Sequence, residues 1–583
     1  MARRDPHSFN DDTQPETASL DWRARIDFQA RALACEATLT LRAPGDGPLD
    51  LDTRDLAIDA VDDAEGRALE FELGKPEPIL GARLRVILPQ GTQRVRIRYR
   101  TAPSASGLQW LEPAQTAGGK HPYLFSQCQA IHARSILPVQ DTPRIRIIYS
   151  AELDVPVALR GLMAAAFVDR SEQGGRAVER WRMPQPIPPY LFALAVGELA
   201  SRDLGPRSRV WAEPSVVEAA AWEFHAVDDM LRTAEALFGP YDWERFDLLC
   251  MPPSFPYGGM ENPRLTFLTP TLLAGDRSLV SVVAHELAHS WTGNLVSNAS
   301  AEHFWLNEGF TVFAERRIVE ALYGADVAAL QAALGRRELE ATLRRFAERP
   351  ALTHLRTKLA GVDPDEAFSD IPYEKGYLFL RAIEEAVGRE AFDRFLRAYV
   401  TSFRFHAITS DDFVALADRE LPGALGKVQA HAWLDGPGLP PSAPHARSAR
   451  LDAIARLGAV VPDDETVRSW TSVEWQLFLE ALPRPAPLAL VEALDARHKL
   501  TARDNYEILV TWLEVALAAH HAPAIARTEE VLAKVGRMKY LRPLYRALAS
   551  RESTRARAES TFARCRAGYH PIAQRVMESV LRG

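Results

Sequence analysis

The sequence predicts a protein of several domains that belongs to the α+β class. Up to about residue 200, apolar and polar residues alternate with a period of two, which is typical of half-buried strands. Beyond about Leu204 the apolar residues follow a helical spacing, which one proline-rich stretch interrupts. A chain of 583 residues also exceeds what one hydrophobic core usually organises, so we expect three or four domains.

The N-terminal part, residues 1–200, is predicted to be an antiparallel β domain. From Leu20 to Phe28 every second residue is apolar and the residues between them are charged. Between residues 94 and 100 four arginines alternate with Val95, Ile97 and Tyr99. A basic cluster of this kind can indicate nucleic-acid binding. The alternation favours instead the solvent-facing side of a half-buried antiparallel strand.

The central part, residues 201–436, contains the string His285-Glu286-Leu287-Ala288-His289. On an α-helix a spacing of four places both histidines on one face, where they can bind one zinc ion. Glu286 need not bind the metal and is better placed to take a proton from a water molecule. A third ligand is required, and Glu308 follows His289 after a spacer, 290–307, long enough to end one helix and begin an antiparallel second.

A His-Glu-x-x-His string also arises by chance, so its surroundings matter. The residues around it are mostly apolar, which predicts a buried helix in which unpaired imidazoles would be costly: Leu279, Val280, Val282, Val283 and Leu287. The second ligand helix is expected from about Glu302 to Leu322, ending near Gly324. Glu315 lies on the same face as Glu308. It either orients a ligand histidine or pairs at the surface with a neighbouring arginine.

Together with the preceding segment Tyr257-Gly258-Gly259-Met260-Glu261-Asn262, this pattern resembles the gluzincin aminopeptidases, the aminopeptidase N-like zinc peptidases. It is most similar to their leukotriene A4 hydrolase branch and the bacterial aminopeptidases related to it. Four other segments carry the same resemblance: 126–132, 372–376, 437–441 and 536–539. The resemblance implies a zincin, thermolysin-like catalytic domain with one zinc ion per chain, held by His285, His289 and Glu308.

The resemblance also implies which residues bind the amino end of a peptide. Glu261 would pair with the substrate's α-ammonium group, helped by Gln129, while Ala130 would offer backbone contacts. Glycines allow a backbone to run close beside a bound peptide, as an edge strand does. The residues expected to do so are Tyr257, Gly258, Gly259 and Met260.

Three further residues receive roles through the resemblance. Tyr373 would donate a hydrogen bond to the oxyanion of the tetrahedral intermediate, and Arg537 and Lys539 would hold the peptide's C-terminal carboxylate. Without the resemblance, Tyr373 would be assigned to packing and the two cations to surface charge. An alternative activity, epoxide hydrolysis, is disfavoured because Phe368 replaces a tyrosine of that branch's lipid site, although the matching Asp365 is retained.

The proline-rich stretch at residues 437–446 is predicted to be an extended linker. Helical patterns return in residues 447–583, as in Val473–Leu482 and Tyr506–Ala519, with short polar breaks between them. Paired amphipathic helices of this kind predict an α-helical solenoid. A solenoid alone would suggest a protein-binding scaffold. A scaffold without activity would be marked by a lost ligand or base, and none is lost.

The composition limits the kinds of partner that this chain is expected to bind. A net charge of −8 argues against a nucleic-acid binder, and no apolar run reaches membrane-spanning length. Four scattered cysteines and an N-terminal stretch without an apolar core predict a reducing cytoplasm. We therefore expect a cytoplasmic, monomeric zinc aminopeptidase that acts on short peptides with a free N-terminus.

Overall fold

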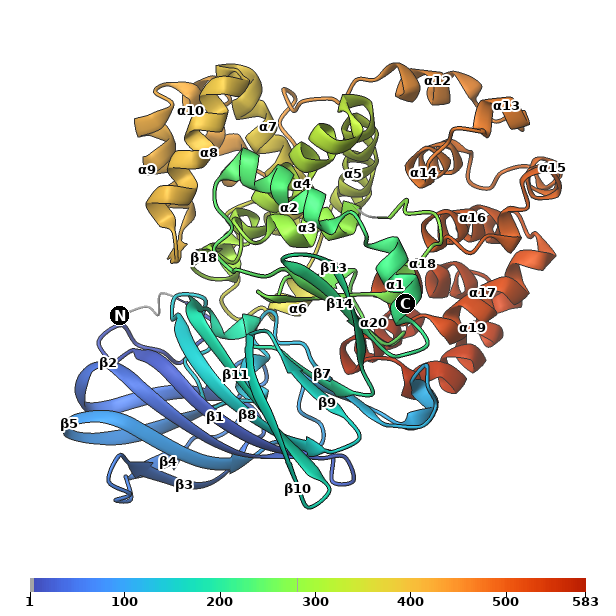
Figure 1. The fold of residues 1–583 in the computed structure, drawn as a ribbon. Coiled ribbons are helices and arrows are strands. Elements are labelled where there is room, and N and C mark those ends of the chain that lie inside the picture. The colour runs from blue at the N-terminus through green and yellow to red at the C-terminus, as the bar shows by residue number, and fades with distance from the viewer. Residues whose placement is uncertain (1–4, 280, 583) are drawn as a thin grey trace.

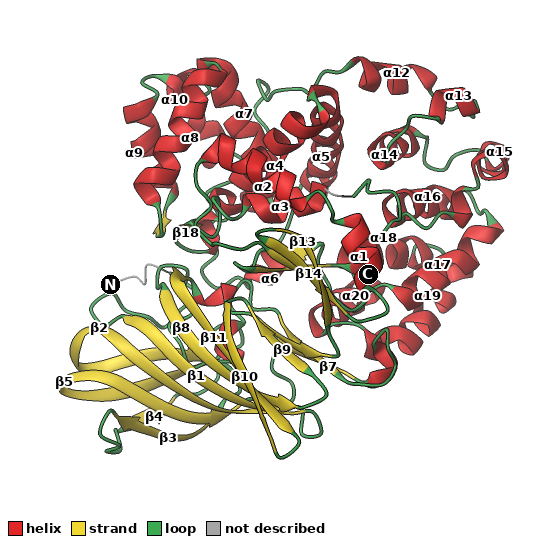
Figure 2. Ribbon diagram, in the orientation of Figure 1, coloured by secondary structure: helices red, strands yellow, loops and turns green. Residues whose placement is uncertain are grey.

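A computed structural model describes residues 5–279 and 281–582. The strands of the N-terminal part lie on one side of the molecule, and helices of the central and C-terminal parts cover the other (Figures 1 and 2). The central and C-terminal helices form two separate groups above the strands. This arrangement confirms the predicted α+β class and its three parts in chain order.

The N-terminal part is built on an eight-stranded sheet with the order β10-β11-β8-β1-β2-β5-β3, in which β4 also pairs with β5. Its strands are β1 Thr17–Asp27, β2 Ala32–Thr53, β3 Ala57–Asp63, β4 Phe71–Leu73, β5 Ala82–Arg100, β8 Ile147–Pro156, β10 Ala166–Gln173 and β11 Arg176–Ile187. The sheet is antiparallel except that β1 and β8 pair in parallel, which the sequence analysis did not predict. Strand β8 can pair with β1 in parallel because the chain leaves this sheet after β5 and forms strands elsewhere before it returns.

A second, four-stranded sheet, β6-β7-β12-β9, packs in the same core. Its strands are β6 Leu108–Leu111, β7 Tyr123–Ser126, β9 Arg160–Met163 and β12 Leu194–Gly197. The predicted alternation is confirmed, since Leu20 and Trp22 of β1 are buried and Asp21 between them is exposed. Arg96 and Arg98 pair with Asp62 on β3, so the basic cluster is the outer face of a strand.

The central part begins with a five-stranded mixed sheet of order β13-β14-β15-β17-β16. Its strands are β13 Ala200–Gly205, β14 Ser208–Ala212, β15 Asp247–Cys250, β16 Gly259–Met260 and β17 Leu265–Leu268. Helices with one extended segment were expected from about Leu204 onward, and that expectation was wrong for β14, β15 and β17. These strands have four or five residues each, too short to show a clear period.

The helices that follow carry the metal motif. Helix α3 covers Ser281–Ala288 and α4 covers Trp305–Tyr323, ending at Gly324 as predicted. Helix α4 packs against α3, against α5 (Ala325–Arg345) and against α7 (Gly376–Val387). A Cβ atom on Gly309 of α4 would lie 2.7 Å from the Cα atom of Gly376, so α4 and α7 meet where neither has a side chain.

The remaining central elements surround this group. They are α1 Val217–Glu223, α2 Val227–Phe238, β18 Val296–Asn298, α6 Pro364–Ala367, the π-helical turn η7 Ile371–Lys375, α8 Arg389–Phe403, β19 His406–Ile408, α9 Ser410–Glu420, α10 Ala424–Lys427 and α11 Ala430–Leu434. Short 3₁₀ turns η1 to η6 are Pro113–Gln115, Ala133–Ser135, Pro189–Leu191, Pro270–Leu272, Ala301–His303 and Pro350–Thr353. Residues 435–448 form neither helix nor strand.

Beyond this segment the chain is helical. The elements are α12 Ala449–Leu457, α13 Asp464–Val467, α14 Ser472–Ala481, α15 Leu488–His498, η8 Leu500–Ala502, α16 Tyr506–Ala518, α17 Ala522–Lys534, α18 Met538–Ala549, α19 Glu552–Cys565, η9 Arg566–Gly568 and α20 Pro571–Arg582. Helices α14, α16, α18 and α20 contact one another in succession, and α17 and α19 cover them. Their hydrophobic core also includes Leu330 and Leu334 of α5, so α5 contributes to both helical groups.

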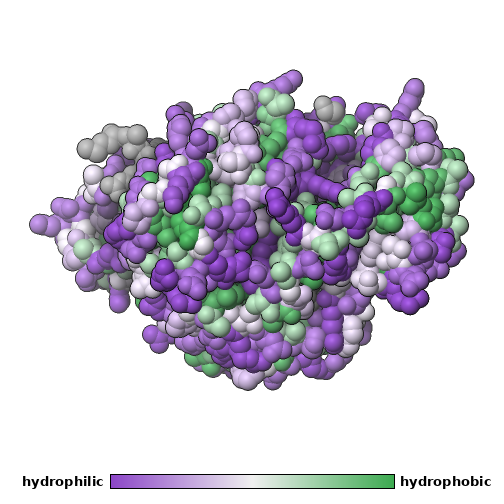
Figure 3. All heavy atoms as spheres, turned by 90° about the horizontal axis from the view of Figure 1, so that it is seen from above, coloured by the Kyte–Doolittle hydropathy of each residue, from purple (hydrophilic) through white to green (hydrophobic). Residues whose placement is uncertain are grey.

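The surface is mainly hydrophilic when viewed from above the helices, with hydrophobic residues in separate areas (Figure 3). Within the described residues, none of the helices combines the length and the apolar character needed to cross a membrane.

Candidate metal centre and peptide site

Helices α3 and α4 bring the three predicted ligands together. The Nε2 atoms of His285 and His289 lie 3.2 Å apart. The Oε2 atom of Glu308 lies 3.4 Å from the first and 3.5 Å from the second. Ligand atoms at about 2.0–2.1 Å from a tetrahedral zinc ion are separated by about 3.3–3.4 Å. The three atoms therefore match the spacing that zinc requires.

The remaining polar atoms of the ligands have partners of their own. His285 Nδ1 lies 3.0 Å from Glu315 Oε2. His289 Nδ1 lies 3.1 Å from both the Thr292 carbonyl oxygen and Thr311 Oγ1. These contacts leave both Nε2 atoms directed at the same point, as in histidine metal sites. Among the described residues, the buried Oε2 of Glu308 has no hydrogen-bond partner, which a metal ion would supply.

The electrostatics of the cluster favour a cation. Burial lowers the pKa of His289 to about 4, which keeps its imidazole neutral, as metal binding requires. Burial also acts to lower the pKa of His285, but the nearby carboxylates of Glu308 and Glu315 outweigh it and raise that pKa well above its usual value. Carboxylates around an imidazole thus attract positive charge to this point.

Glu286 projects from α3 towards the edge strand β16. It is buried, and its carboxylate lies against Gly259, where an added Cβ atom would stand 2.2 Å from Oε1. Carboxylate oxygens of Glu261 and Glu286 and a ring nitrogen of His289 lie within 4.8 Å of one another. Burial raises the pKa of Glu286 well above its usual value, although His285 opposes the shift. Glu286 is therefore next to the metal cluster without occupying one of its three corners.

Glu261 and Gln129 form a second polar pair beside this cluster. Gln129 Nε2 donates to Glu261 Oε1 at 3.3 Å, across the boundary between the first and second parts of the chain. Asn294 Nδ2 donates to the Glu261 carbonyl oxygen at 2.7 Å, which fixes the backbone behind the side chain. Burial raises the pKa of Glu261 to about 7. A buried carboxylate with few donors around it is suited to receive an ammonium group.

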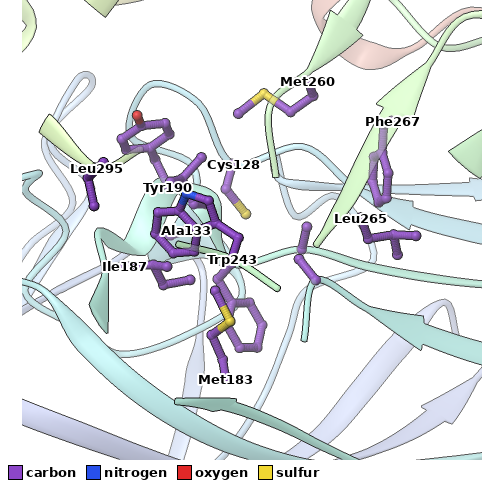
Figure 4. Close-up of a cluster of buried hydrophobic side chains, with 14 of the residues drawn as sticks. Cys128, Ala133, Met183, Ile187, Tyr190, Trp243, Met260, Leu265, Phe267 and Leu295 are labelled. Atoms are coloured by element: carbon purple, nitrogen blue, oxygen red, sulfur yellow. The ribbon is translucent and has the colours of Figure 1, made fainter. Parts of the chain in front are cut away.

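A hydrophobic cluster supports this pair from behind. Cys128 and Met260, the neighbours of Gln129 and Glu261 in the sequence, both lie within it (Figure 4). The Met260 side chain thus faces the core, and its sulfur accepts a hydrogen bond from Gln127 Nε2 at 3.1 Å. Of the predicted substrate-binding residues, Met260 therefore borders the site with its backbone and not with its side chain.

Tyr373 approaches from the other side on the π-helical turn η7. Its ring is stacked on the His285 ring with a centroid distance of 6.1 Å. Phe304 and Phe368 contact it edge-on, at centroid distances of 6.2 and 5.8 Å. Packing on three sides holds the phenol beside the metal cluster, as its predicted role requires.

A pocket opens next to Tyr373. Its lining includes Gln129, Ala130, Tyr257, Phe304, Leu355 and Phe368. Asp365 also lines it, and Asp365 Oδ2 lies 3.0 Å from His132 Nε2 and 3.8 Å from Arg575 of α20. The pocket is thus largely apolar, and the charge of its Asp365 carboxylate is already countered by His132 and Arg575.

Arg537 reaches the rim of the site, the edge where Gln129, residues 257–261 and Arg537 meet, from the C-terminal helices. The backbone amides of Gly536 and Met538 donate to the carbonyl oxygens of Pro253 and Pro256 at 2.7 and 2.8 Å. Arg537 is 6% exposed, and its Nη2 atom lies so close to Gly258 that an added Cβ atom would stand 2.8 Å away. The alternative of a surface charge is therefore wrong for Arg537.

Glu507 holds both predicted carboxylate-binding cations. Its Oε1 atom accepts from Arg537 Nη1 at 3.1 Å, and its Oε2 atom lies 3.0 Å from Lys539 Nζ. Burial opposes the charge of Glu507, but Lys539 and Arg537 outweigh it and lower its pKa to about 2. The Lys539 side chain is 44% exposed, so it lies nearer the solvent than Arg537.

Several residues at the site were missed by the sequence analysis. Thr311 could have been found, because it lies three residues after Glu308 and hence on the same helix face. Glu507 and Asn294 could not, since each acts on a residue far away in the sequence. Glu315, for which two alternatives stood, contacts His285 and not its neighbouring arginines.

Comparison with known proteins agrees with this geometry. The Peptidase M1 N-terminal domain matches residues 15–191, the Peptidase family M1 domain residues 222–432, and the leukotriene A4 hydrolase C-terminal domain residues 470–581. Leukotriene A-4 hydrolase of Xenopus laevis is 39% identical over 98% of each chain.

The chain belongs to peptidase family M1. It is a zinc metallo-aminopeptidase of this family, so the predicted family, enzyme class and cofactor are confirmed. Leucine aminopeptidase 2 of Neosartorya fischeri is 37% identical over 100% of this chain and 98% of its own length. The structure of yeast LTA4 hydrolase in complex with bestatin is 32% identical, with a TM-score of 0.93 over 100% of this chain and 98% of that one. These full-length matches confirm the three-domain architecture.

Proposed function

We propose that this enzyme removes the N-terminal residue from short peptides, with zinc held by His285, His289 and Glu308. The supporting observation is the triangle of ligand atoms at 3.2–3.5 Å, whose Glu308 oxygen has no other partner among the described residues. A zinc ion held there supplies Lewis-acid polarisation of the scissile carbonyl and lowers the pKa of a water molecule.

The chain's own residues divide the remaining work. Glu286 takes a proton from the attacking water and passes it to the leaving amine. Tyr373 donates a hydrogen bond to the oxyanion. Stacking on His285 holds its ring in place for this contact. Glu261 and Gln129 receive the substrate's α-ammonium group, which fixes the scissile bond one residue from the N-terminus.

The far end of a short peptide would lie along the rim. We assign its backbone to the edge formed by Tyr257, Gly258, Gly259 and the Met260 main chain, with Ala130 opposite. Arg537 and Lys539 would receive its C-terminal carboxylate, and a planar guanidinium suits that group. Support comes from the contact between Arg537 and Gly258, which joins the two segments directly.

No observation favours epoxide hydrolysis as a second activity. Phe368 lines the pocket but has no hydroxyl group to offer a reacting oxygen. Asp365 is already engaged by His132.

We further infer a cytoplasmic monomer with domain bounds at 1–200, 201–436 and 447–583, joined by the linker 437–446. All four cysteines are free, and three of them are buried, which suits a reducing compartment. Light scattering of the purified protein tests the monomer.

A panel of aminoacyl fluorogenic substrates, assayed with and without a chelator, tests the proposed activity. Turnover that the chelator abolishes and added zinc restores is expected. Turnover that survives complete zinc removal would contradict the proposal.

A further inference from the structure

Helix α4 carries two consecutive buried arginines that make matching ion pairs with different elements. Arg316 and Arg317 are each 7% exposed. Arg316 binds Glu374 of η7 with both terminal nitrogens, at 3.0 and 2.6 Å. Arg317 binds Asp393 of α8 in the same two-pronged way, at 2.7 and 3.2 Å. The two arginines therefore have the same exposure and the same forked ion pair, but they bind different elements, and Arg317 Nη1 also lies 3.7 Å from Glu384 of α7.

The carboxylate bound by Arg316 is adjacent to the catalytic phenol, because Glu374 directly follows Tyr373 in η7. The pair is closely enclosed. A Cβ atom on Gly335 of α5 would lie 2.2 Å from Glu374 Oε1 and 2.5 Å from Arg316 Nη2. The guanidinium also lies over the Tyr377 ring, 4.0 Å from its centroid. One side chain thus holds the chain at two points after Tyr373.

The same stretch of α4 also holds the metal cluster. Glu315, the residue before Arg316, accepts from His285 Nδ1 at 3.0 Å, and Glu308 lies two turns earlier. Neighbouring residues of α4 therefore fix His285 on one side and the turn that carries Tyr373 on the other. The distance between the metal ligands and the phenol is set through this helix.

We propose that Arg316 is a positioning residue for Tyr373, acting through Glu374 to hold the phenol where the oxyanion develops. The inference rests on the proposed role of Tyr373. Removing the guanidinium would leave Glu374 as a buried, unpaired carboxylate, which is costly enough to move the turn towards water. A displacement of about 1 Å at a reacting group can cost 10²-fold in rate.

The effect has a kinetic signature that a merely structural ion pair lacks. The hydrogen bond to an oxyanion exists only in the transition state, so its loss lowers kcat and leaves KM unchanged. Loss of this hydrogen bond also lowers the affinity for a phosphinic peptide, whose tetrahedral oxygen imitates the oxyanion, more than the affinity for a product amino acid. When the phenol hydroxyl has already been removed, substitution of Arg316 should cause little further loss of kcat, because there is no hydroxyl left to displace.

The experiment compares Arg316→Met with Arg317→Met, each in the native chain and in Tyr373→Phe. The readouts are kcat and KM on a tripeptide, phosphinic-peptide affinity, zinc content and Tm. We expect Arg316→Met to lower kcat at least tenfold with KM within twofold and zinc unchanged. Arg317→Met should lose a similar amount of Tm and keep native kcat. In the Tyr373→Phe background, Arg316→Met should lower kcat less than twofold further.

The positioning role of Arg316 and the oxyanion role of Tyr373 would be overturned by different results. A drop for Arg316→Met that is equally large in the Tyr373→Phe background, or that Arg317→Met reproduces, overturns the positioning role alone. Native kcat for Tyr373→Phe itself overturns the oxyanion role as well. If Arg316→Met does not fold, Arg316→Lys and Arg317→Lys replace the pair. Arg316→Lys has one point charge in place of the fork, so it should still lower kcat, but by less than the loss expected of Arg316→Met. This loss should also disappear in the Tyr373→Phe background, and Arg317→Lys should keep native kcat.

Discussion

The metal cluster and the peptide-binding rim meet in one site but are built in different ways. His285, His289 and Glu308 come from a single segment and two adjoining helices, and their orienting partners lie on or next to the same helices. The rim combines Gln129, Glu261 and Arg537, which belong to three different parts of the chain. The first depends on helix geometry, whereas the second depends on how the domains pack.

The metal cluster and the rim should therefore tolerate different substitutions. The metal ligands and the groups that orient them all lie on or next to α3 and α4. The rim exists only while residues 536–538 stay hydrogen-bonded to residues 253–256 and Gln129 stays beside Glu261. Variants should therefore separate into those that change zinc or chemistry and those that change substrate selection.

The largest expected effect is that of Glu286→Gln, which removes the base and leaves the three ligands. We predict that kcat falls roughly 10²–10⁴-fold, the range for loss of general acid–base catalysis. Metal analysis should show native zinc content, in contrast to Glu308→Ala, which should lose the metal. Loss of zinc from Glu286→Gln would mean that Glu286 is a ligand.

Arg537→Ala tests the rim. It should remove most of the preference for a tripeptide acid over its C-terminal amide, a loss of about 1.5–3 kcal/mol in kcat/KM for a hydrogen bond to a charged group. Arg537→Lys should restore only part, because an ammonium cannot reproduce the fork. Aminoacyl anilides, which have no carboxylate, serve as the control. Equal acid-to-amide ratios for the native enzyme and Arg537→Ala would return this residue to a scaffold role.

Glu315→Gln tests the support of the metal cluster. It keeps the size of the side chain but weakens the contact with His285 Nδ1, and zinc affinity should fall about 10–100-fold. Competition with a chelating dye measures the affinity. Unchanged affinity would show that α3 alone fixes the His285 ring.

Gly259→Ala probes the point where the two regions touch. The added methyl would stand 2.2 Å from Glu286 Oε1, so the base must leave its position. We expect a loss of about tenfold in kcat, the equivalent of about 1.4 kcal/mol, with zinc retained. Gly258→Ala is the matched control, because its methyl meets Arg537 and should alter acid-to-amide preference instead.

The same division explains what the sequence could predict. The ligand helices follow from a spacing of four residues and a spacer, and α4 ends at Gly324 as expected. Thr311 and Glu315 occupy helix positions that spacing alone defines. The β domain also follows from its alternation, because each strand buries one face.

Contacts between residues far apart in the sequence could not be predicted from local spacing. The short strands of the central sheet are too brief to show a period, and the parallel pairing of β1 with β8 depends on the path of the chain between them. Arg316 and Glu374 are far apart in the sequence, and nothing near either one predicts their ion pair. Roles for Gln129, Glu261 and Arg537 came from the family resemblance, since each would otherwise be an ordinary loop or surface residue.

The most direct test of the central claim, that this site recognises a free N-terminus beside zinc, is the turnover of a tripeptide and its N-acetylated form. Zinc-loaded native enzyme and Glu261→Gln are compared on both substrates. We expect the native enzyme to cleave the free peptide much faster, and Glu261→Gln to lower kcat and raise KM for that peptide. Equal turnover of the free and acetylated peptides by the native enzyme would contradict the claim.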